Sequence, residues 1–161
     1  MNNSYTTSAT SSKTLESFES FVIVHEPRLR RAFVAAYGGE RGREATAEAL
    51  AYAWEHWDRI SVMANPGGYL YRVGQSKTRS RRRPLTYLPV DANDATWDPR
   101  LVPALTSLTQ RQRTAVVLIH GFDWSLREVS ELTGTKVTTV QNHLERGMSK
   151  LRQQLKEGNN G

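Results

Sequence analysis

Apolar residues recur at helical spacing along the first part of the chain. The first such stretch predicts a helix of 3.6 residues per turn, with an apolar face made of Leu15, Phe18, Val22, Leu29, Phe33 and Tyr37. We expect Pro27 to divide or kink this helix and the pair Gly38-Gly39 to end it. Before it, residues 1–14 are low in apolar content and predict a disordered tail.

Two further helices are predicted before the middle of the chain. The second should stop at the Asn-Pro-Gly-Gly cluster of residues 65–68, and its apolar face consists of Ala45, Ala49, Leu50, Ala53, Trp54 and Trp57. Packing is the expected role of both tryptophans. The third helix opens at Tyr69 and runs into a basic stretch that ends at Arg83, before Pro84.

Local chemistry marks three more helices after residue 104. Thr109 with Gln112, and Ser125 with Glu128, have the spacing of two capping boxes. Gly121 and Gly134 are the expected stops of the helices that these boxes begin. The last helix carries a long apolar stripe, Val137, Val140, Leu144, Met148, Leu151 and Leu155.

These patterns predict an all-α chain with two small helical domains. The first spans residues 15–83 and the second residues 104–157, with a short tail at residues 158–161. Residues 84–103 contain three prolines and Asp91, Asp94 and Asp98 without periodicity, which predicts an extended acidic linker.

Composition narrows the possible functions. The formal net charge is +6 and the pI is near 9.9, which favours phosphate backbones or anionic membrane surfaces as partners. The absence of cysteine excludes disulfides and thiolate-based sites. No stretch approaches the roughly 18 apolar residues of a membrane span, and the N-terminus does not resemble a signal peptide, so we expect a cytoplasmic protein without membrane insertion.

The sequence gives little support to an enzyme. His25, His56, His120 and His143 are scattered, and no metal or nucleophile spacing joins them. We therefore expect no catalysis, no metal and no cofactor.

Residues 125–144 form the most informative segment. A short capped helix, a tight turn at Gly134 and a second helix with a polar face are typical of a helix-turn-helix. Ser130 permits close approach of the two helices, Gly134 supplies a positive φ, and the shared core is expected to contain Val129, Leu132, Val137 and Val140. Two ordinary amphipathic helices are the alternative to this interpretation.

The expected DNA-reading residues lie mainly at the start of the second helix of this motif, where side chains reach base edges in the major groove. They are Arg127, Lys136, Thr138, Thr139, Gln141, Asn142, His143 and Arg146. Gln141 and Asn142 suit adenine, and Arg127 suits the phosphate backbone.

A basic run near residue 80 is a second candidate for nucleic-acid binding. Aromatic rings beside cations suit single-stranded or melting DNA, through stacking and phosphate neutralisation. The candidate residues are Tyr69, Arg72, Lys77, Arg79, Arg82 and Arg83. A solvated helix end is the simpler interpretation of the run, and Tyr69 could belong to the core.

Taken together, the chain after residue 15 resembles an extracytoplasmic-function (ECF) sigma factor, a compact class of the sigma-70 family of bacterial RNA polymerase subunits. The N-terminal half is similar to the family's promoter-melting domain through Phe18 to Phe21, Pro27-Arg28-Leu29, Ala53-Trp54, Pro66 and Tyr69 to Val73. The C-terminal half is similar to the domain that reads the upstream promoter element through Leu105, Leu108 to Arg113, Glu128 to Leu144 and Leu151-Arg152. Two features depart from the family: Tyr69 stands where a tryptophan is common, and only Glu44 and Glu48 remain of an acidic cluster that docks on polymerase.

The resemblance implies a factor for promoter recognition and transcription initiation. Its implied partners are core RNA polymerase, docked through Glu44 and Glu48, and promoter DNA, with an anti-sigma protein as a further candidate. The acidic linker would thread toward the polymerase active site. The alternative function is a stand-alone helix-turn-helix regulator, which would normally need a dimer and a palindromic site.

Overall fold

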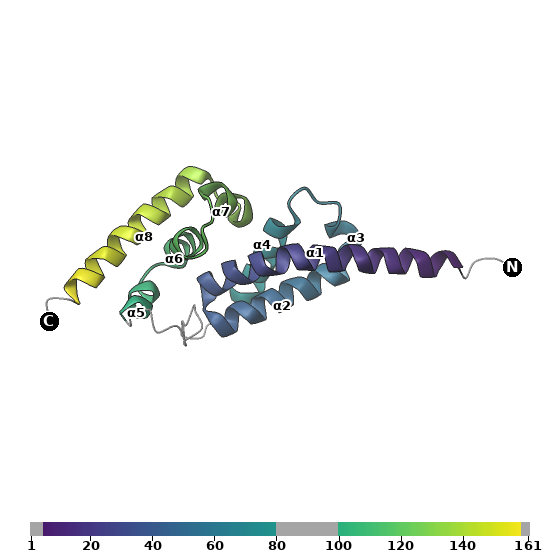
Figure 1. Cartoon of the computed structure of the whole chain (residues 1–161), viewed down its shortest axis with the longest axis horizontal. Helices are drawn as coiled ribbons and strands as arrows, with labels where there is room; N and C mark the ends of the chain where they lie inside the picture. Colours follow the sequence, from purple (N-terminus) through teal and green to yellow (C-terminus); the bar gives the residue numbers. More distant parts are fainter. Residues whose placement is uncertain (1–4, 80–99, 159–161) are drawn as a thin grey trace.

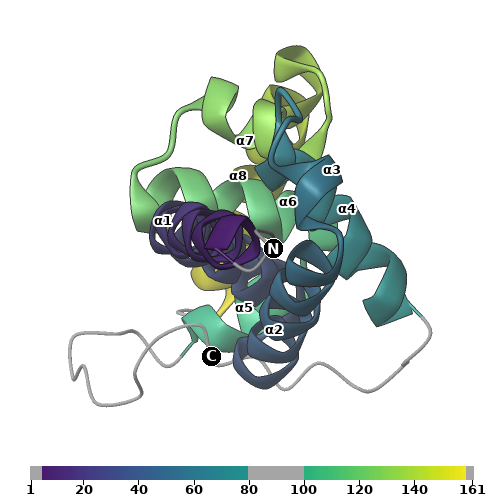
Figure 2. The same cartoon turned by 90° about the vertical axis from the view of Figure 1, so that its right-hand side faces the viewer.

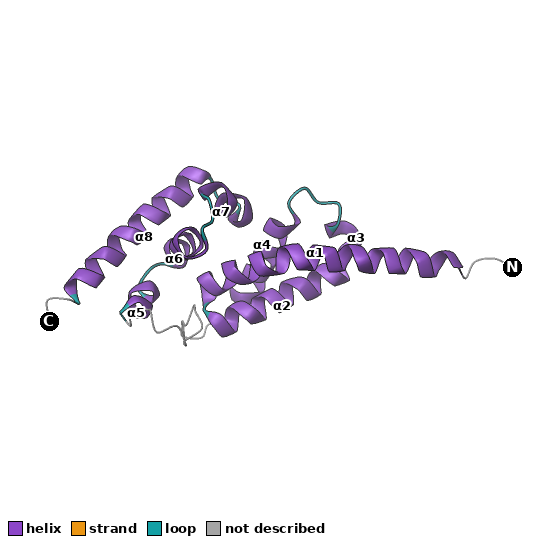
Figure 3. Ribbon diagram, viewed as in Figure 1, coloured by secondary structure: helices purple, strands orange, loops and turns teal. Residues whose placement is uncertain are grey.

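The protein folds into helices throughout the part that the structure describes. The structure is a computed structural model of the chain, and it describes residues 5–79 and 100–158 (Figure 1). Within these ranges every regular element is helical and no strand occurs (Figure 3). The prediction of an all-α fold is therefore confirmed.

Four helices make up the N-terminal residues that the structure describes, 5–79. They are α1 (Tyr5–Tyr37), α2 (Gly39–Glu55), α3 (Trp57–Ile60) and α4 (Pro66–Arg79). Between α1 and α2, Gly38 has φ of 88°, a conformation that glycine adopts without steric cost. The chain can therefore reverse within one residue, and α2 runs back along α1.

The helix boundaries differ from the prediction at three places. α1 begins at Tyr5, inside the expected disordered tail, because a formed helix propagates at low cost through adjacent residues. It also continues through Pro27 as one element. The second predicted helix breaks at His56, and the third begins at Pro66, since proline is tolerated in the first turn of a helix.

The C-terminal half contains five elements. They are α5 (Leu101–Thr106), α6 (Gln110–Val116), the π-helical turn η1 (Val117–Gly121), α7 (Leu126–Thr133) and α8 (Val137–Glu157). Both predicted capping boxes are present, at Thr109 and at Ser125. The expected linker ends earlier than predicted because Leu101 to Pro103 belong to α5, and its residues 84–99 lie outside the described residues.

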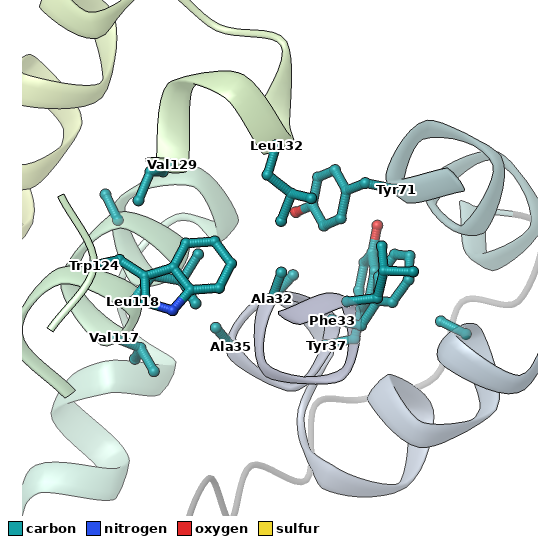
Figure 4. Packing of buried hydrophobic residues seen from close by; sticks show 14 of the residues in the cluster. Ala32, Phe33, Ala35, Tyr37, Tyr71, Val117, Leu118, Trp124, Val129 and Leu132 are labelled. Atoms are coloured by element: carbon teal, nitrogen blue, oxygen red, sulfur yellow. The ribbon is translucent and has the colours of Figure 1, made fainter. Parts of the chain in front are cut away.

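The two halves pack directly on each other. α6, η1 and α7 lie beside α1 and α4, as the view along α1 shows (Figure 2). In the close-up, Leu132 of α7 points toward Tyr71 and Ala32, and Trp124 lies by Leu118 and Ala35 (Figure 4). The halves therefore share one buried apolar core, which we call the seam, instead of being held only by a linker.

A buried arginine supplies the main polar contact of the seam. Arg113 is only 2% exposed, and its Nε and Nη2 donate to the carbonyls of Ala35 at 3.1 Å and Ala36 at 2.7 Å. Its Nη1 donates to Leu108 O at 3.1 Å. The last carbonyls of a helix lack partners within that helix, and a cation there also favours the helix dipole. Arg113 thus caps the C-terminal end of α1 from the other half of the chain.

Further polar contacts join the two halves along the seam. Arg28 Nη1 lies 3.3 Å from Glu128 Oε1, and its guanidinium stands 4.3 Å from the centre of the Trp124 ring. Asn65 Nδ2 donates to Glu131 O at 2.8 Å. Each of these pairs joins an N-terminal residue to one that follows it by more than 60 positions.

We predict that Arg113→Met lowers the free energy of unfolding by about 2–4 kcal/mol, because methionine fills similar space but leaves buried carbonyls without a donor. Urea unfolding followed by circular dichroism measures this change. Arg152→Met is the matched control, since Arg152 is exposed on α8, and it should change the stability by no more than about 0.5 kcal/mol. Equal effects of the two variants would contradict the assigned role of Arg113.

Candidate nucleic-acid interface

The helix-turn-helix is built by α7, its turn and the start of α8. Ser125 Oγ accepts from Glu128 N at 3.1 Å, and Glu128 Oε2 accepts from Ser125 N at 2.8 Å, which closes the capping box. Gly134 has φ of 67°, as the sequence predicted. Ser130 fixes the turn, because its Oγ donates to Thr135 O at 2.6 Å and its carbonyl accepts from Thr135 N at 3.2 Å.

Three of the four expected core residues of this motif are buried: Val129, Leu132 and Val140. Val137 was expected with them but is 41% exposed. It is the first residue of α8, where the helix has just left the turn, so its side chain lies at the edge of the shared core.

Most of the candidate upstream-element residues lie exposed on this motif. The exposed ones are Arg127, Lys136, Thr138, Gln141, Asn142 and Arg146, and Thr139 is partly buried. Gln141 Nε2 donates to Glu145 Oε1 at 3.1 Å, so its amide is already oriented along the exposed side of α8. The structure therefore brings this set together on the first turns of α8, with Arg127 on the exposed side of α7.

His143 differs from the rest of the set because it faces the seam. Its Nε2 atom is buried and has no hydrogen-bond partner among the described residues. Burial lowers the pKa of His143, and the nearby guanidiniums of Arg111 and Arg146 lower it further, since both changes disfavour a second proton on the ring. The sequence pattern placed His143 on the polar face without indicating this burial.

The downstream candidates occupy α4. Tyr69 is partly buried, and Arg72 and Lys77 are exposed. Arg79 ends α4, but its side chain and the whole of Arg82 and Arg83 lie outside the described residues.

Tyr69 belongs to a cluster that the sequence did not reveal. Arg59 Nη2 donates to Tyr52 Oη at 2.7 Å and to Tyr69 Oη at 3.0 Å, and the two phenol oxygens are 3.2 Å apart. The ring of His56 stacks on that of Tyr52 at 4.1 Å, and Lys77 Nζ lies 5.4 Å from the centre of the Tyr52 ring. We call these five residues the phenol–arginine cluster.

The phenol–arginine cluster joins rings and cations from three helices. Tyr52 and His56 show the spacing of one helical turn, but only the fold brings Arg59 and Tyr69 to them. The hydrogen bond from Tyr69, followed by the Arg59 guanidinium, lowers the pKa of Tyr52, while the shared hydrogen bond raises the pKa of Tyr69. The cluster therefore presents π surfaces and fixed positive charge together, as single-stranded nucleic acid requires.

The upstream and downstream candidates lie close together in this arrangement. A Cβ atom placed on Gly134 would stand 3.3 Å from Arg72 Nη1, so Arg72 of α4 adjoins the turn of the helix-turn-helix. Packing of α7 on α4 holds the two sets in this relation.

The two candidate polymerase-docking residues lie on α2. Glu44 is exposed and Glu48 is partly buried. Their spacing of four residues places them on one side of α2, as docking through a shared surface requires.

Within the described ranges no three His, Asp or Glu side chains are grouped so that they could hold a metal ion. None of the described helices combines the length and the apolar character needed to cross a membrane.

Comparisons with known proteins point to one family. Residues 100–151 match the family model described as "Sigma-70, region 4". The fold is similar to that of the sigma factor RpoE from Bartonella quintana, in its co-crystal structure with the anti-sigma factor NepR. The TM-score is 0.59 at 19% sequence identity, over 86% of this chain and 96% of that one. No curated protein sequence matches the chain significantly.

We predict that Arg59→Gln raises the pKa of Tyr52, because the phenolate loses a charged donor. An ultraviolet pH titration of phenolate absorption measures this shift, with Tyr52→Phe used to assign the signal. Arg30→Gln serves as the control, since Arg30 pairs with Glu26 on α1 at 2.8 Å and is not part of the cluster. An unchanged titration curve in Arg59→Gln would show that the guanidinium does not stabilise the phenolate.

Proposed function

We propose that this chain, which belongs to the sigma-70 family of RNA polymerase sigma factors, works as an ECF-type factor that directs promoter recognition and transcription initiation. The observation that carries the proposal is the match of residues 100–151 to region 4 of that family. In the same segment the helix-turn-helix is completely formed, with its cap, its left-handed glycine and an exposed polar helix start. A sigma factor needs no reaction of its own, so we propose that the chain is not an enzyme.

The first step of the proposed mechanism is reading of the upstream promoter element as duplex. α8 would enter the major groove with Gln141 and Asn142 toward base edges, while Arg127 and Lys136 hold phosphates. The exposure of these four side chains supports this role, because they can reach DNA without a change in α7 or α8. Thr138, Thr139, His143 and Arg146 complete the proposed surface.

The second step is capture of unstacked bases at the downstream element. Extruding a base costs a few kcal/mol, so stacking surfaces and phosphate-binding cations must offset that cost. The phenol–arginine cluster supports this role because Arg59 holds the two tyrosine rings together. Arg72, Lys77, Arg79, Arg82 and Arg83 would then bind the phosphates of the opened strand.

The domains would divide these tasks. Residues 15–83 would melt the promoter and bind polymerase, with Glu44 and Glu48 at the docking surface. Residues 104–157 would read the upstream element. The acidic residues 84–103 between them would thread into a positively lined path of the polymerase.

Core RNA polymerase and promoter DNA are the obligatory partners in this proposal, and the place of action is the cytoplasm. We also propose an anti-sigma protein as a partner, since the similar structure from Bartonella quintana is a complex with one. A stand-alone helix-turn-helix regulator is not favoured, because the matched family is that of a polymerase subunit.

The test of the proposal is in vitro transcription with bacterial core polymerase and a library of promoter-like templates. We expect new, specific 5′ ends that require the added protein. Specific duplex binding without polymerase, together with no new 5′ ends, would refute the sigma-factor function and favour the stand-alone regulator.

We predict that Gln141→Ala lowers discrimination at one position of the upstream element by about 1–3 kcal/mol, because a direct contact to a base is lost. Competition binding by the reconstituted holoenzyme, using templates substituted in that element, measures the change. Gln153→Ala is the matched control, since Gln153 also donates to a carboxylate four residues on at 3.1 Å but lies near the end of α8. If Gln141→Ala weakened binding to random DNA equally, direct readout would be excluded.

A further inference from the structure

A cavity of about 830 Å³ opens at the seam, and both halves of the chain line it. The N-terminal half contributes Tyr37 and Gln75 among others, and the C-terminal half contributes Thr109 and His143 among others. Cavities of roughly 300–1,000 Å³ are typical of small-molecule sites, so this one is too small for a DNA duplex. We call it the seam cavity.

The charged side chains in the described lining of the seam cavity are all arginines. Its described lining includes Arg41, Arg111, Arg113 and Arg146, and it includes no aspartate or glutamate. Arg113 is engaged by backbone carbonyls, and Arg41 Nη2 donates to Thr78 O at 3.3 Å. Arg111 and Arg146 are exposed and form no ion pair with a described residue. Arg111 and Arg146 are therefore available to a ligand, and Arg41, whose guanidinium has five N–H donors, can bind a ligand in addition to Thr78 O.

His143 adds a polar group without a described hydrogen-bond partner to the lining of the seam cavity. Its buried Nε2 has no partner among the described residues, although a buried polar atom normally has one. Both Arg111 and Arg146 lie near enough to lower its pKa. An anion between these three side chains would neutralise the two guanidiniums and give the imidazole an acceptor.

We propose that the seam cavity binds a small multivalent phosphate anion, such as the phosphate chain of a nucleotide. Arg111 and Arg146 would hold it from the C-terminal half, and Arg41 from the N-terminal half. A guanidinium presents paired donors that match phosphate oxygens, and the hydroxyl of Thr135 in the lining adds a further polar group. This site adjoins the proposed promoter-reading surface, with which it shares His143 and Arg146.

Binding of this anion would also bias the conformation of the chain. Because the ligand would contact arginines of both halves, it would bind their packed arrangement better than any arrangement in which the halves separate. A ligand stabilises the state that it prefers. The anion would therefore favour the seam seen here.

The test uses the full chain and inorganic tripolyphosphate in isothermal titration calorimetry, with ionic strength held constant by sodium chloride. We expect saturable binding at one site, and a loss of affinity of about 10- to 100-fold in Arg111→Gln, since a charged hydrogen-bond donor is removed. Arg41→Gln should also weaken binding, because the site draws on both halves. Arg152→Gln is the matched control and should bind as the unmodified chain does, because Arg152 does not line the cavity.

Three outcomes would overturn the proposal. The first is an absence of saturable binding, and the second is equal loss of affinity in Arg111→Gln and Arg152→Gln, which would indicate diffuse charge. The third is that Arg111→Gln weakens binding of a short DNA duplex but leaves tripolyphosphate binding unchanged. That result would show that Arg111 binds DNA phosphates and not a small anion. Circular dichroism confirms that each variant is folded. Because the calorimetry includes no polymerase, its result is independent of the transcription experiment.

Discussion

The arrangement of the whole chain depends on one buried cation. The charged guanidinium of Arg113 is buried in the core, where it would be strongly unfavourable without hydrogen-bond partners. Its guanidinium donates to the carbonyls of Ala35 and Ala36 at the end of α1 and to Leu108 O, and these hydrogen bonds hold α6 against α1. The apolar contacts of Trp124, Leu132 and Tyr71 then fill the space that this geometry defines. Two sets of helices that could each form a small core thus share one.

Local rules predicted the helical elements well, because the signals for them lie within a few residues. The capping boxes at Thr109 and Ser125 and the positive φ at Gly134 are examples, since each depends on residues at most three positions apart. The errors arose where neighbours along the chain compete. Of the two outcomes expected at Pro27, division of the helix did not occur, and the continuous periodicity through Trp57 concealed the break at His56. The seam was not predicted at all, because a pattern of apolar residues does not say which apolar face meets which.

The residues of the candidate site could likewise be predicted where they share one helix, but not where they come from several helices. The upstream set could be predicted as a group because it lies mostly on a single helix, whose exposed face follows from spacing alone. His143 was the exception, since its burial depends on the partner that α8 meets across the seam cavity. The phenol–arginine cluster was missed for a related reason: Tyr52, Arg59 and Tyr69 come from three helices, and their phenol and guanidinium groups meet only after α2, α3 and α4 have packed.

The ion pair between Arg28 and Glu128 limits how early during synthesis the protein can complete its folding. The partners are 100 residues apart in the chain. At a synthesis rate of about 5–20 residues per second, α1 would leave the ribosome roughly 5–20 s before its partner in α7 has been made. During that interval Arg28 and the carbonyl end of α1 are exposed to water and to other proteins. The N-terminal half must therefore hold α1 in place by its own contacts with α2 until synthesis of α6 and α7 supplies the groups that cover it.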